Sequence, residues 1–192
     1  MKTGPPTSQQ LRAAVGRRLP DVIAPDLKVL FCGINPGLYS AAVGHHFARP
    51  GNRFWPVLHR AGFTPRLLTP GETWLLLLHG YGLTDIVPRA TARADELSKE
   101  ELVAGRKRLA RKVRRYGPRW VAILGIGAYR AAFLQPHAEV GPQSGRLGGA
   151  RIWVLPNPSG LNASHQAADL ARAFRRLRLA AWRTVASVEL AT

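Results

Sequence analysis

The chain has 192 residues, which is enough for one domain with a sizeable hydrophobic core. Its longest apolar run, residues 74–78, is far shorter than the roughly 20 residues that a membrane-spanning helix needs, which excludes such a helix. A single cysteine excludes a disulfide framework and a four-cysteine metal site. The first residues lack the continuous apolar segment of a signal peptide, so a cytoplasmic protein is expected.

The charge of the chain is strongly positive, with 28 Lys and Arg residues against 11 Asp and Glu residues and a net charge of +17. A GC-rich genome would account for the preference of arginine over lysine but not for the shortage of acidic residues. A polyanionic partner, most simply nucleic acid, accounts for the charge better. A membrane surface fits less well, because no predicted helix combines a basic face with a broad apolar face.

The first predicted segment is a basic leader over residues 1–25, expected to be partly disordered or to form a short helix. A single folded domain is expected over residues 26–188. It begins with a strand over residues 27–34, because LKVLFCGI is an almost continuous apolar run. A long irregular loop is predicted over residues 40–52.

Helices and strands alternate in the rest of the chain. Helices are predicted over residues 53–61, 71–79, 98–116, 128–134 and 163–188. Strands are predicted over residues 82–87, 120–125 and 152–155. The helix over 98–116 has the clearest signals, because Ser98 and Glu101 form a capping box. Its remaining surface is basic, which predicts a solvated face that adds salt-sensitive attraction to phosphates.

This alternation predicts an α/β fold, a three-layer α/β/α sandwich around a central, mainly parallel four-stranded sheet. In such sheets, ligands bind beyond the carboxyl ends of the strands. Two turns rich in glycine and proline follow predicted strands, GINPG at residues 33–37 and PNPSG at residues 156–160. These two turns are the places where a functional site is expected.

The GINPG turn has neither the spacing of a P-loop nor that of a dinucleotide-binding motif, so no nucleotide cofactor is predicted. Pro36 and Gly37 suit a type II turn, and a purely structural turn is one interpretation. The other interpretation gives the single asparagine, Asn35, a chemical role.

Five motifs identify a resemblance to a known family. They are GINPGL (33–38), GHHFARPGNRFW (44–55), YGLTDIVPRATARADELSKEEL (81–102), ILGIGAY (123–129) and WVLPNPSGL (153–161). Together they resemble the mismatch-specific uracil-DNA glycosylases, that is bacterial Mug and its thymine-DNA glycosylase relatives, within the uracil-DNA glycosylase superfamily. The resemblance covers residues 27–180.

The resemblance implies an α/β/α sandwich that hydrolyses the N-glycosidic bond of uracil or thymine mispaired with guanine in double-stranded DNA. It implies that Asn35 positions the attacking water, that Phe47 stacks on the flipped base and that Leu161 enters the helix as a wedge. Further base-binding residues are expected at Gly33, Ile34, Gly37 and Asn157. The wedge and widowed-guanine loop is expected at Pro158, Ser159, Gly160, Leu161 and Asn162.

These roles agree with the chemistry of the residues. Extruding a base costs a few kcal/mol, and a wedge that fills the vacated stack offsets part of that cost. An aromatic face contributes about 1–3 kcal/mol of stacking to the extruded base. Two alternatives stay open: Phe47 as a core residue and Leu161 as cover for the C-terminal helix. Asn162 and Ala163 depart from the family pattern, so mismatch discrimination does not follow from the motif alone.

A neutral asparagine cannot act as a strong general base. Asn35 can hold a water molecule, while backbone N–H groups of the turn stabilise a departing uracil anion and Gly33 and Gly37 let the backbone approach the base. A supporting carboxylate is sought among Asp85, Asp95 and Glu96. Asp95 is the supplementary catalytic candidate, and the alternative for Asp95 is a turn or pre-helix cap.

No metal site and no cofactor are predicted, because His45 and His46 are adjacent in sequence and no other ligand types cluster with them. Neither motif places a lysine for lyase chemistry. The expected enzyme is therefore a monofunctional, monomeric glycosylase whose partner is double-stranded DNA with a G·U or G·T mismatch, and whose candidate substrates include etheno-cytosine. The alternatives are a broad-specificity glycosylase that also accepts A·U pairs and single strands, and a non-catalytic mismatch-binding protein.

Overall fold

A five-stranded mixed sheet forms the centre of the protein in the computed structural model, which describes residues 4–160 and 166–189. The strands are β1 (Val29–Gly33), β2 (Tyr81–Asp85), β3 (Trp120–Leu124), β4 (Gly141–Leu147) and β5 (Ala150–Leu155). Their spatial order is β2-β1-β3-β5-β4, with parallel pairing throughout except for the antiparallel pair β4 and β5. The expected α/β class is confirmed, and the expected four-stranded sheet is wrong by this one edge strand.

The additional strand, β4, has a sequence that does not read as a strand. GPQSGRL contains two glycines and a proline, lacks regular apolar alternation, and is exposed at most of its positions. A turn at Gly148 and Gly149, both with positive φ, returns the chain to β5, and the pairing is irregular between Gln143 and Arg146. An edge strand needs burial on only part of its surface, so hairpin pairing rather than hydrophobicity determines this one.

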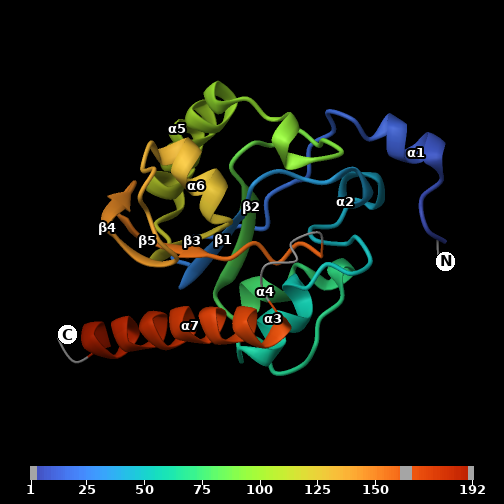
Figure 1. Ribbon diagram of the computed structural model, residues 1–192. Helices are drawn as coiled ribbons and strands as arrows, with labels where there is room; N and C mark the ends of the chain where they lie inside the picture. Colours follow the sequence, from blue (N-terminus) through green and yellow to red (C-terminus); the bar gives the residue numbers. More distant parts are fainter. Residues whose placement is uncertain (1–3, 161–165, 190–192) are drawn as a thin grey trace.

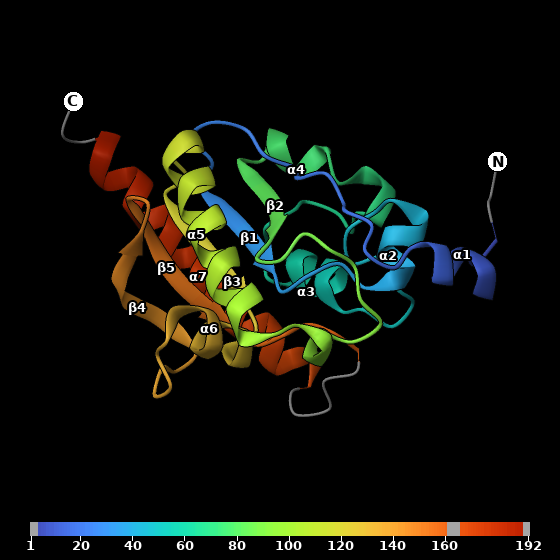
Figure 2. The same ribbon diagram turned by 90° about the horizontal axis from the view of Figure 1, so that it is seen from above.

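Helices cover both faces of the sheet (Figure 1). The α-helices are α1 (Ser8–Ala13), α2 (Leu38–Val43), α3 (Phe54–Arg60), α4 (Leu75–Leu78), α5 (Lys99–Tyr116), α6 (Ile126–Phe133) and α7 (Ala167–Glu189), and the 3-10 turns are η1 (Pro70–Glu72) and η2 (Ala94–Glu96). Viewed from above, α5 and α6 lie in front of the strands and α7 lies behind them (Figure 2). None of the helices in the described ranges is long and apolar enough to cross a membrane.

Helix α2 includes residues 40–43, the first four residues of the long irregular loop expected over residues 40–52, and this part of the prediction is corrected. Gly37 is the N-cap of the helix, and Gly44, with φ of 79°, ends it in the left-handed conformation. The helix has six residues, so its apolar positions were too few to indicate a period. Helix α2 matters for the site because it begins directly after the GINPG turn.

Two hydrophobic clusters fill the space on either side of the sheet. One lies against α3 and α7 and contains the rings of Phe31, Phe54 and Phe174. The other lies against α5 and α6 and contains Leu109 and Ile123. Every residue of β1 and β3 is buried, as the continuous apolar runs predict for strands covered on both faces.

The N-terminal segment packs along β2 rather than away from the domain. Val22 forms an antiparallel bridge with Leu83, and Arg18 forms one with Arg89. Helix α1 lies beside α2 in both ribbon views (Figures 1 and 2). The expected division into a leader and a domain stays a prediction, but Val22 pairs with β2 and Arg18 pairs with the loop that follows it.

Lys112 of α5 has a role that its place in a basic helix did not indicate. Its ammonium group forms an ion pair with Asp21 and donates a hydrogen bond to Thr84 Oγ1, at 2.6 Å. Thr84 in turn donates to Asp21 Oδ1, at 2.7 Å. Asp21, Thr84 and Lys112 therefore tie the N-terminal segment, β2 and α5 together one residue before the end of β2.

Candidate active site

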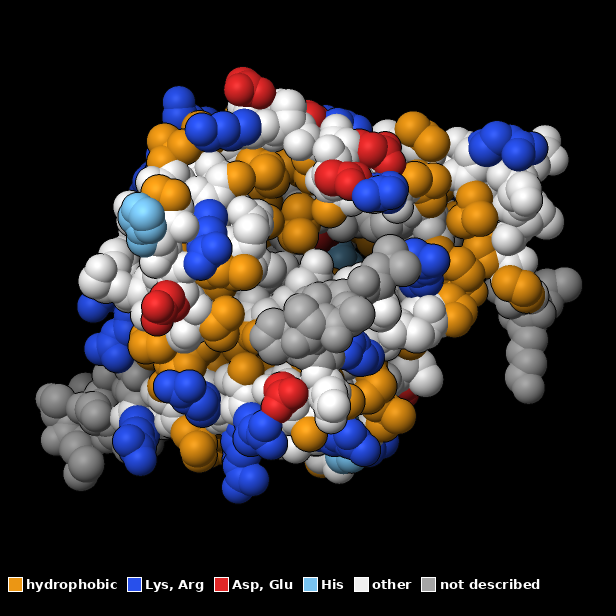
Figure 3. All heavy atoms as spheres, viewed as in Figure 1, with side chains coloured by type: hydrophobic (Ala, Val, Ile, Leu, Met, Phe, Trp, Pro, Cys, Tyr) orange, Lys and Arg blue, Asp and Glu red, His pale blue; other side chains and the backbone are white. Residues whose placement is uncertain are grey.

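A cavity of about 600 Å³ lies beyond the carboxyl ends of the parallel strands. It is lined by the GINPG turn, by the end of β2, and by the loops that follow α2, β2 and β5. The space-filling view shows the hollow in this face of the molecule, with an acidic side chain and a histidine at its bottom (Figure 3). The two turns rich in glycine and proline thus meet at one cavity, as the general rule for parallel sheets predicts.

The structure gathers most of the expected site residues around this cavity. Those that line it are Gly33, Ile34, Asn35, Gly37, Phe47, Asp95, Asn157 and Ser159. Pro158 and Gly160 belong to the same loop as Asn157. Leu161 and Asn162, the expected wedge and guanine-contacting residues, lie outside the described residues. The cavity establishes where the described residues lie, and the role of each one stays a prediction.

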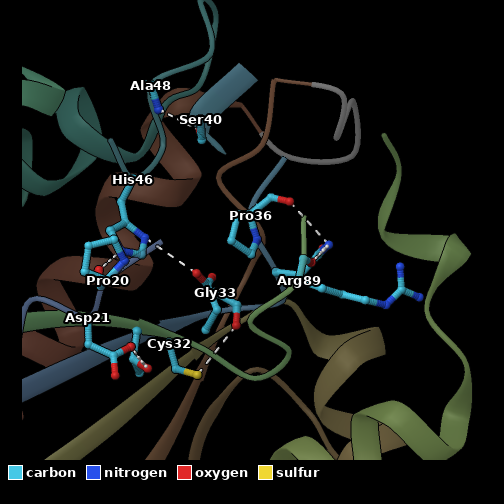
Figure 4. Close-up of polar contacts among 12 residues, drawn as sticks. Pro20, Asp21, Cys32, Gly33, Pro36, Ser40, His46, Ala48 and Arg89 are labelled. Atoms are coloured by element: carbon cyan, nitrogen blue, oxygen red, sulfur yellow. Dashed lines mark hydrogen bonds and ion pairs between the residues drawn. The ribbon is translucent and has the colours of Figure 1, made fainter. Parts of the chain in front are cut away.

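The amide group of Asn35 has a fixed orientation. Its nitrogen donates to the carbonyl oxygens of Pro36 and Arg89, both labelled in Figure 4, at 3.3 and 3.0 Å. It also donates to Thr91 Oγ1, at 2.7 Å. A carbonyl oxygen only accepts hydrogen bonds, so the atom on this side must be Nδ2. Asn35 Oδ1 is therefore the atom that can accept a hydrogen bond from a water molecule in the cavity.

Thr91 fixes this orientation in a second way. The residue is 2% exposed, and its hydroxyl donates to the carbonyl oxygen of Arg93, at 2.6 Å, while it accepts from Asn35. The hydroxyl hydrogen is thereby committed to Arg93, which leaves only lone pairs for Asn35 Nδ2. The loop after β2 thus holds the catalytic candidate of the first turn in place.

Phe47 has an unusual backbone conformation for a large residue. Its φ of 54° lies in the left-handed region, which costs of order 1 kcal/mol or more for a residue other than glycine. Its ring stacks on Phe54, with centroids 4.1 Å apart and an angle of 22° between the planes, and it also lines the cavity. The two interpretations of Phe47 are therefore compatible, since the ring packs on the core cluster while it borders the cavity.

The cavity contains a buried carboxylate, Asp85, at the last position of β2. Its side chain is 7% exposed, and Gly33 lies directly opposite it in the parallel pairing of β1 and β2. A Cβ atom at Gly33 would overlap Asp85 Oδ1, so glycine leaves room for the carboxyl group where it lies. Burial raises the pKa of Asp85 to about 6, against the lowering effect of His46, whose Nδ1 lies 3.6 Å from Asp85 Oδ2.

Asp95, the carboxylate chosen from the sequence, lies in a different environment. Its side chain is 61% exposed at the rim of the cavity, on η2. Arg93 binds it through two hydrogen bonds, at 3.0 and 2.5 Å, and this partner holds the pKa of Asp95 below its usual range. A solvated carboxylate paired with arginine is a weaker base than a buried one, so the geometry favours Asp85 for a chemical role.

The loop Asn157–Gly160 is held against the segment that carries GNRFW. The backbone N–H of Arg53 donates to the Pro158 carbonyl, at 3.0 Å, and its guanidinium donates to the Ser159 carbonyl, at 2.9 Å. Asn157 Oδ1 accepts from the Ser159 N–H, at 3.0 Å, which closes a turn within the loop. Two motifs that are about a hundred residues apart in sequence are thus fixed to each other at the cavity.

Comparison with protein families identifies the superfamily of the chain. Residues 20–183 match the family model described as the uracil DNA glycosylase superfamily. The chain belongs to the uracil-DNA glycosylase superfamily. Among solved structures, it is similar to the solution NMR structure of a proposed uracil DNA glycosylase from Methanosarcina acetivorans, with a TM-score of 0.55 and 21% sequence identity over 85% of this chain and 99% of that chain.

Membership of the superfamily supports a DNA glycosylase function, that is hydrolysis of N-glycosidic bonds in DNA. It does not distinguish the mismatch-specific enzymes from other branches. No group of three or more potential metal ligands is present among the described residues of this glycosylase-family chain.

Several residues at the site were not found from the sequence. They are Thr91, which holds Asn35, Arg53, which holds the second loop, and His46, which contacts Asp85. Arg53 and His46 lie within motifs of the glycosylase family, but motifs do not reveal contacts between segments. A signal did exist for Asp85, because an acidic residue at the carboxyl end of a parallel strand is itself typical of a ligand site.

Replacing Thr91 with valine is expected to lower the single-turnover rate of uracil excision by the glycosylase about tenfold. Valine has the same shape but cannot accept from Asn35 Nδ2, and the unfolding free energy is expected to fall by about 1 kcal/mol. Thr91→Ser keeps the hydroxyl and should stay within about threefold of wild type. Equal rates for the valine and serine variants would contradict the role of the hydroxyl.

Replacing Gly160 with alanine tests the contact between the two loops. An added Cβ would overlap the carbonyl oxygen of Gly51, so the loop must move away from the segment around Arg53. Excision of uracil from paired duplex is expected to fall about tenfold, with little change for single-stranded uracil, where no stack must be filled. Gly127→Ala on α6, where an added Cβ has open space, is the matched control. An equal loss on both substrates would contradict a role in opening the duplex.

Proposed function

We propose that this protein is a monofunctional DNA glycosylase that hydrolyses the N-glycosidic bond of uracil mispaired with guanine in double-stranded DNA and leaves an abasic site. Thymine and etheno-cytosine opposite guanine are further candidate substrates. The observation that carries the proposal is the presence of Asn35 and the buried Asp85 in one cavity at the carboxyl ends of β1 and β2.

In this mechanism the target base leaves the stack and enters the cavity against the ring of Phe47. A water molecule is held by Asn35 Oδ1 and loses a proton to Asp85 as its oxygen bonds to C1′ of the sugar. The bond from C1′ to the base breaks, and the electron pair departs with the uracil anion. Backbone N–H groups of the turn after β1 supply hydrogen bonds to that anion.

The expectation that Asn35 works with a carboxylate is retained, with Asp85 as the proposed base. Its burial and its pKa of about 6 leave it ionised but basic near neutral pH. Asp95 stays as the alternative base at the rim of the cavity. Single variants of the two residues distinguish them. Replacing the carboxylate that acts as general base by a neutral residue should lower the rate more than about a hundredfold, and replacing the other should not.

Preference for uracil opposite guanine is proposed from the family motifs and from the fixed loop Asn157–Gly160, which leads into the expected wedge. A broad-specificity glycosylase is the second candidate. The observation that favours it is again Asp85. An enzyme with a positioned general base depends less on how easily the target nucleobase leaves the stack.

The test is single-turnover cleavage of matched duplexes that contain G·U, A·U or G·T, and of single-stranded uracil, by the wild-type protein. Fastest cleavage of G·U, with A·U and single strands about tenfold slower or more, is the expected result. Equal rates on all uracil substrates would replace mismatch specificity by the broad-specificity function. Binding of G·U duplex without any cleavage would overturn the enzymatic proposal.

A further inference from the structure

His46 is a buried histidine that the proposed mechanism does not use. Its ring lies between the N-terminal segment and the end of β2 (Figure 4). Nε2 is 3.0 Å from the carbonyl oxygen of Pro20, and Nδ1 is 3.6 Å from Asp85 Oδ2. The side chain of His46 is 6% exposed, so neither contact is mediated by bulk solvent.

The Pro20 carbonyl determines which nitrogen of the ring carries hydrogen. A carbonyl oxygen has no hydrogen to donate, so Nε2 must be the N–H nitrogen. Any additional proton on His46 therefore binds to Nδ1, which is the atom that faces Asp85. Protonation of this histidine places its new N–H toward the buried carboxylate.

The other charged or titratable groups near Asp85 do not take the place of His46 as its partner of opposite charge. Asp21 and Lys112 act on Asp85 with opposite signs, and they form an ion pair with each other. The thiol of Cys32 is also close, but burial raises its pKa well above the usual range, so it stays neutral. Among these groups His46 exerts the largest electrostatic effect on Asp85, in the direction that favours its ionised form.

We propose that His46 is a charge-partner and positioning residue, held by the Pro20 carbonyl so that its protonated Nδ1 keeps the buried Asp85 ionised and ready to accept a proton from water. The catalytic part of this proposal rests on the proposed glycosylase function. The proton balance is simple: water gives one proton to Asp85, and its oxygen forms the bond to C1′. The proton then passes to solvent or to the released base, which restores the ion pair.

The segment around Pro20 thereby belongs to the catalytic apparatus. Leu19 lines the cavity, Pro20 orients His46, and Asp21 binds Thr84 next to Asp85. Three consecutive residues of a segment expected to be a leader thus contact the site or the residues that support it.

The first test compares His46→Gln with His45→Gln. Glutamine is neutral at both positions, and His45 is exposed and does not contact Asp85, so it is the matched control. In ¹³C spectra of labelled aspartate, the carboxyl midpoint of Asp85 is expected to rise by about one unit in His46→Gln only. An unchanged or lowered midpoint in that variant would overturn the proposal, whether or not the protein cleaves DNA.

The second test is the pH dependence of single-turnover cleavage of G·U duplex. The loss in His46→Gln is expected to be about tenfold at pH 6 and less than about threefold at pH 9, because the pKa of Asp85 rises. A loss that is uniform across pH would indicate a structural role and overturn the proposal. In the Asp85→Asn background, His46→Gln should cause no further loss.

A third measurement needs no variant. The ¹⁵N shifts of the His46 ring in the wild-type protein should show hydrogen on Nε2 throughout, and hydrogen on Nδ1 as well while the ion pair with Asp85 is formed. The opposite tautomer would overturn the proposal. If the wild-type protein cleaves no uracil, the glycosylase function fails, and the ¹³C and ¹⁵N measurements still decide whether the ion pair exists.

Discussion

Asp85→Asn is expected to lower the single-turnover rate of uracil excision at pH 7.5 by about 10²- to 10³-fold. A positioned general base contributes about 10²–10⁴ to a rate, and asparagine keeps the shape of the side chain but cannot accept the proton of water. In the wild-type protein the rate should rise with pH to a midpoint near 6, the pKa of Asp85. The variant should show no such rise between pH 5 and pH 7.

The control for this experiment is Asp169→Asn on α7, where the carboxylate is paired with Arg172 and does not line the cavity. That variant should keep the wild-type rate and pH profile. Asp95→Ala separates the two candidate bases. If Asp95→Ala lost the rise with pH and Asp85→Asn kept it, the role of base would move from β2 to the rim.

Asp85→Asn is expected to leave the folded protein at least as stable as wild type at neutral pH. The pKa of Asp85 is raised from 3.8 to about 6 in the folded state, so the folded state binds more protons than the unfolded state between these values. Stability then falls as pH rises through this window, by up to roughly 3 kcal/mol for two pKa units. Asparagine does not ionise, so the Tm of the variant should exceed that of wild type by several degrees at pH 7.5 and converge with it near pH 4.

Asn35→Ala is expected to lower the single-turnover rate about 10²-fold while binding of the abasic product duplex changes less than about threefold. Alanine removes the Oδ1 acceptor that holds the water, and misplacement of a reactant by about 1 Å costs about 10²-fold. The comparison requires both single-turnover cleavage and a binding measurement with the abasic product duplex. A rate within tenfold of wild type would mean that Asp85 orients the water without Asn35.

The double variant Asn35→Ala with Asp85→Asn distinguishes joint from separate action. If both residues act on one water molecule, the double variant should be little slower than Asp85→Asn alone, because groups that act as a unit are not additive. A loss equal to the product of the two single losses would instead indicate that Asn35 acts on a different step, such as base binding.

The parts of the fold that were predicted from the sequence are those that local physics determines. The capping box of Ser98 and Glu101 starts α5 as expected, and the apolar runs of β1 and β3 are buried on both faces. Strand β4 and helix α2 were missed because a hairpin turn and two flanking glycines define them. Neither element has enough apolar periodicity to be recognised in isolation.

The site was predicted in part for a related reason. The two motifs identified both loops of the cavity, because each loop is a continuous stretch of sequence. The suitability of Asp85 as a general base depends on its burial and on the strand register, which pairs it with Gly33 about fifty residues away. The orientation of the His46 ring depends on a third segment, through the Pro20 carbonyl. Contacts between distant segments leave no local signal. The position of Asp85 at the end of a strand was a local signal, but it revealed neither the burial of the carboxylate nor its partners, and Asp95 was chosen instead.

The opposition of Gly33 and Asp85 also constrains how this protein can change. Asp85 Oδ1 occupies the volume that any side chain at position 33 would fill, so the two positions do not accept substitutions independently. Asp85 can be replaced while glycine is present at position 33. Once a residue larger than glycine is present there, aspartate no longer fits at position 85 in its present conformation. With a larger residue at position 33, restoring aspartate at position 85 alone would bring its carboxyl group into overlap with the new side chain.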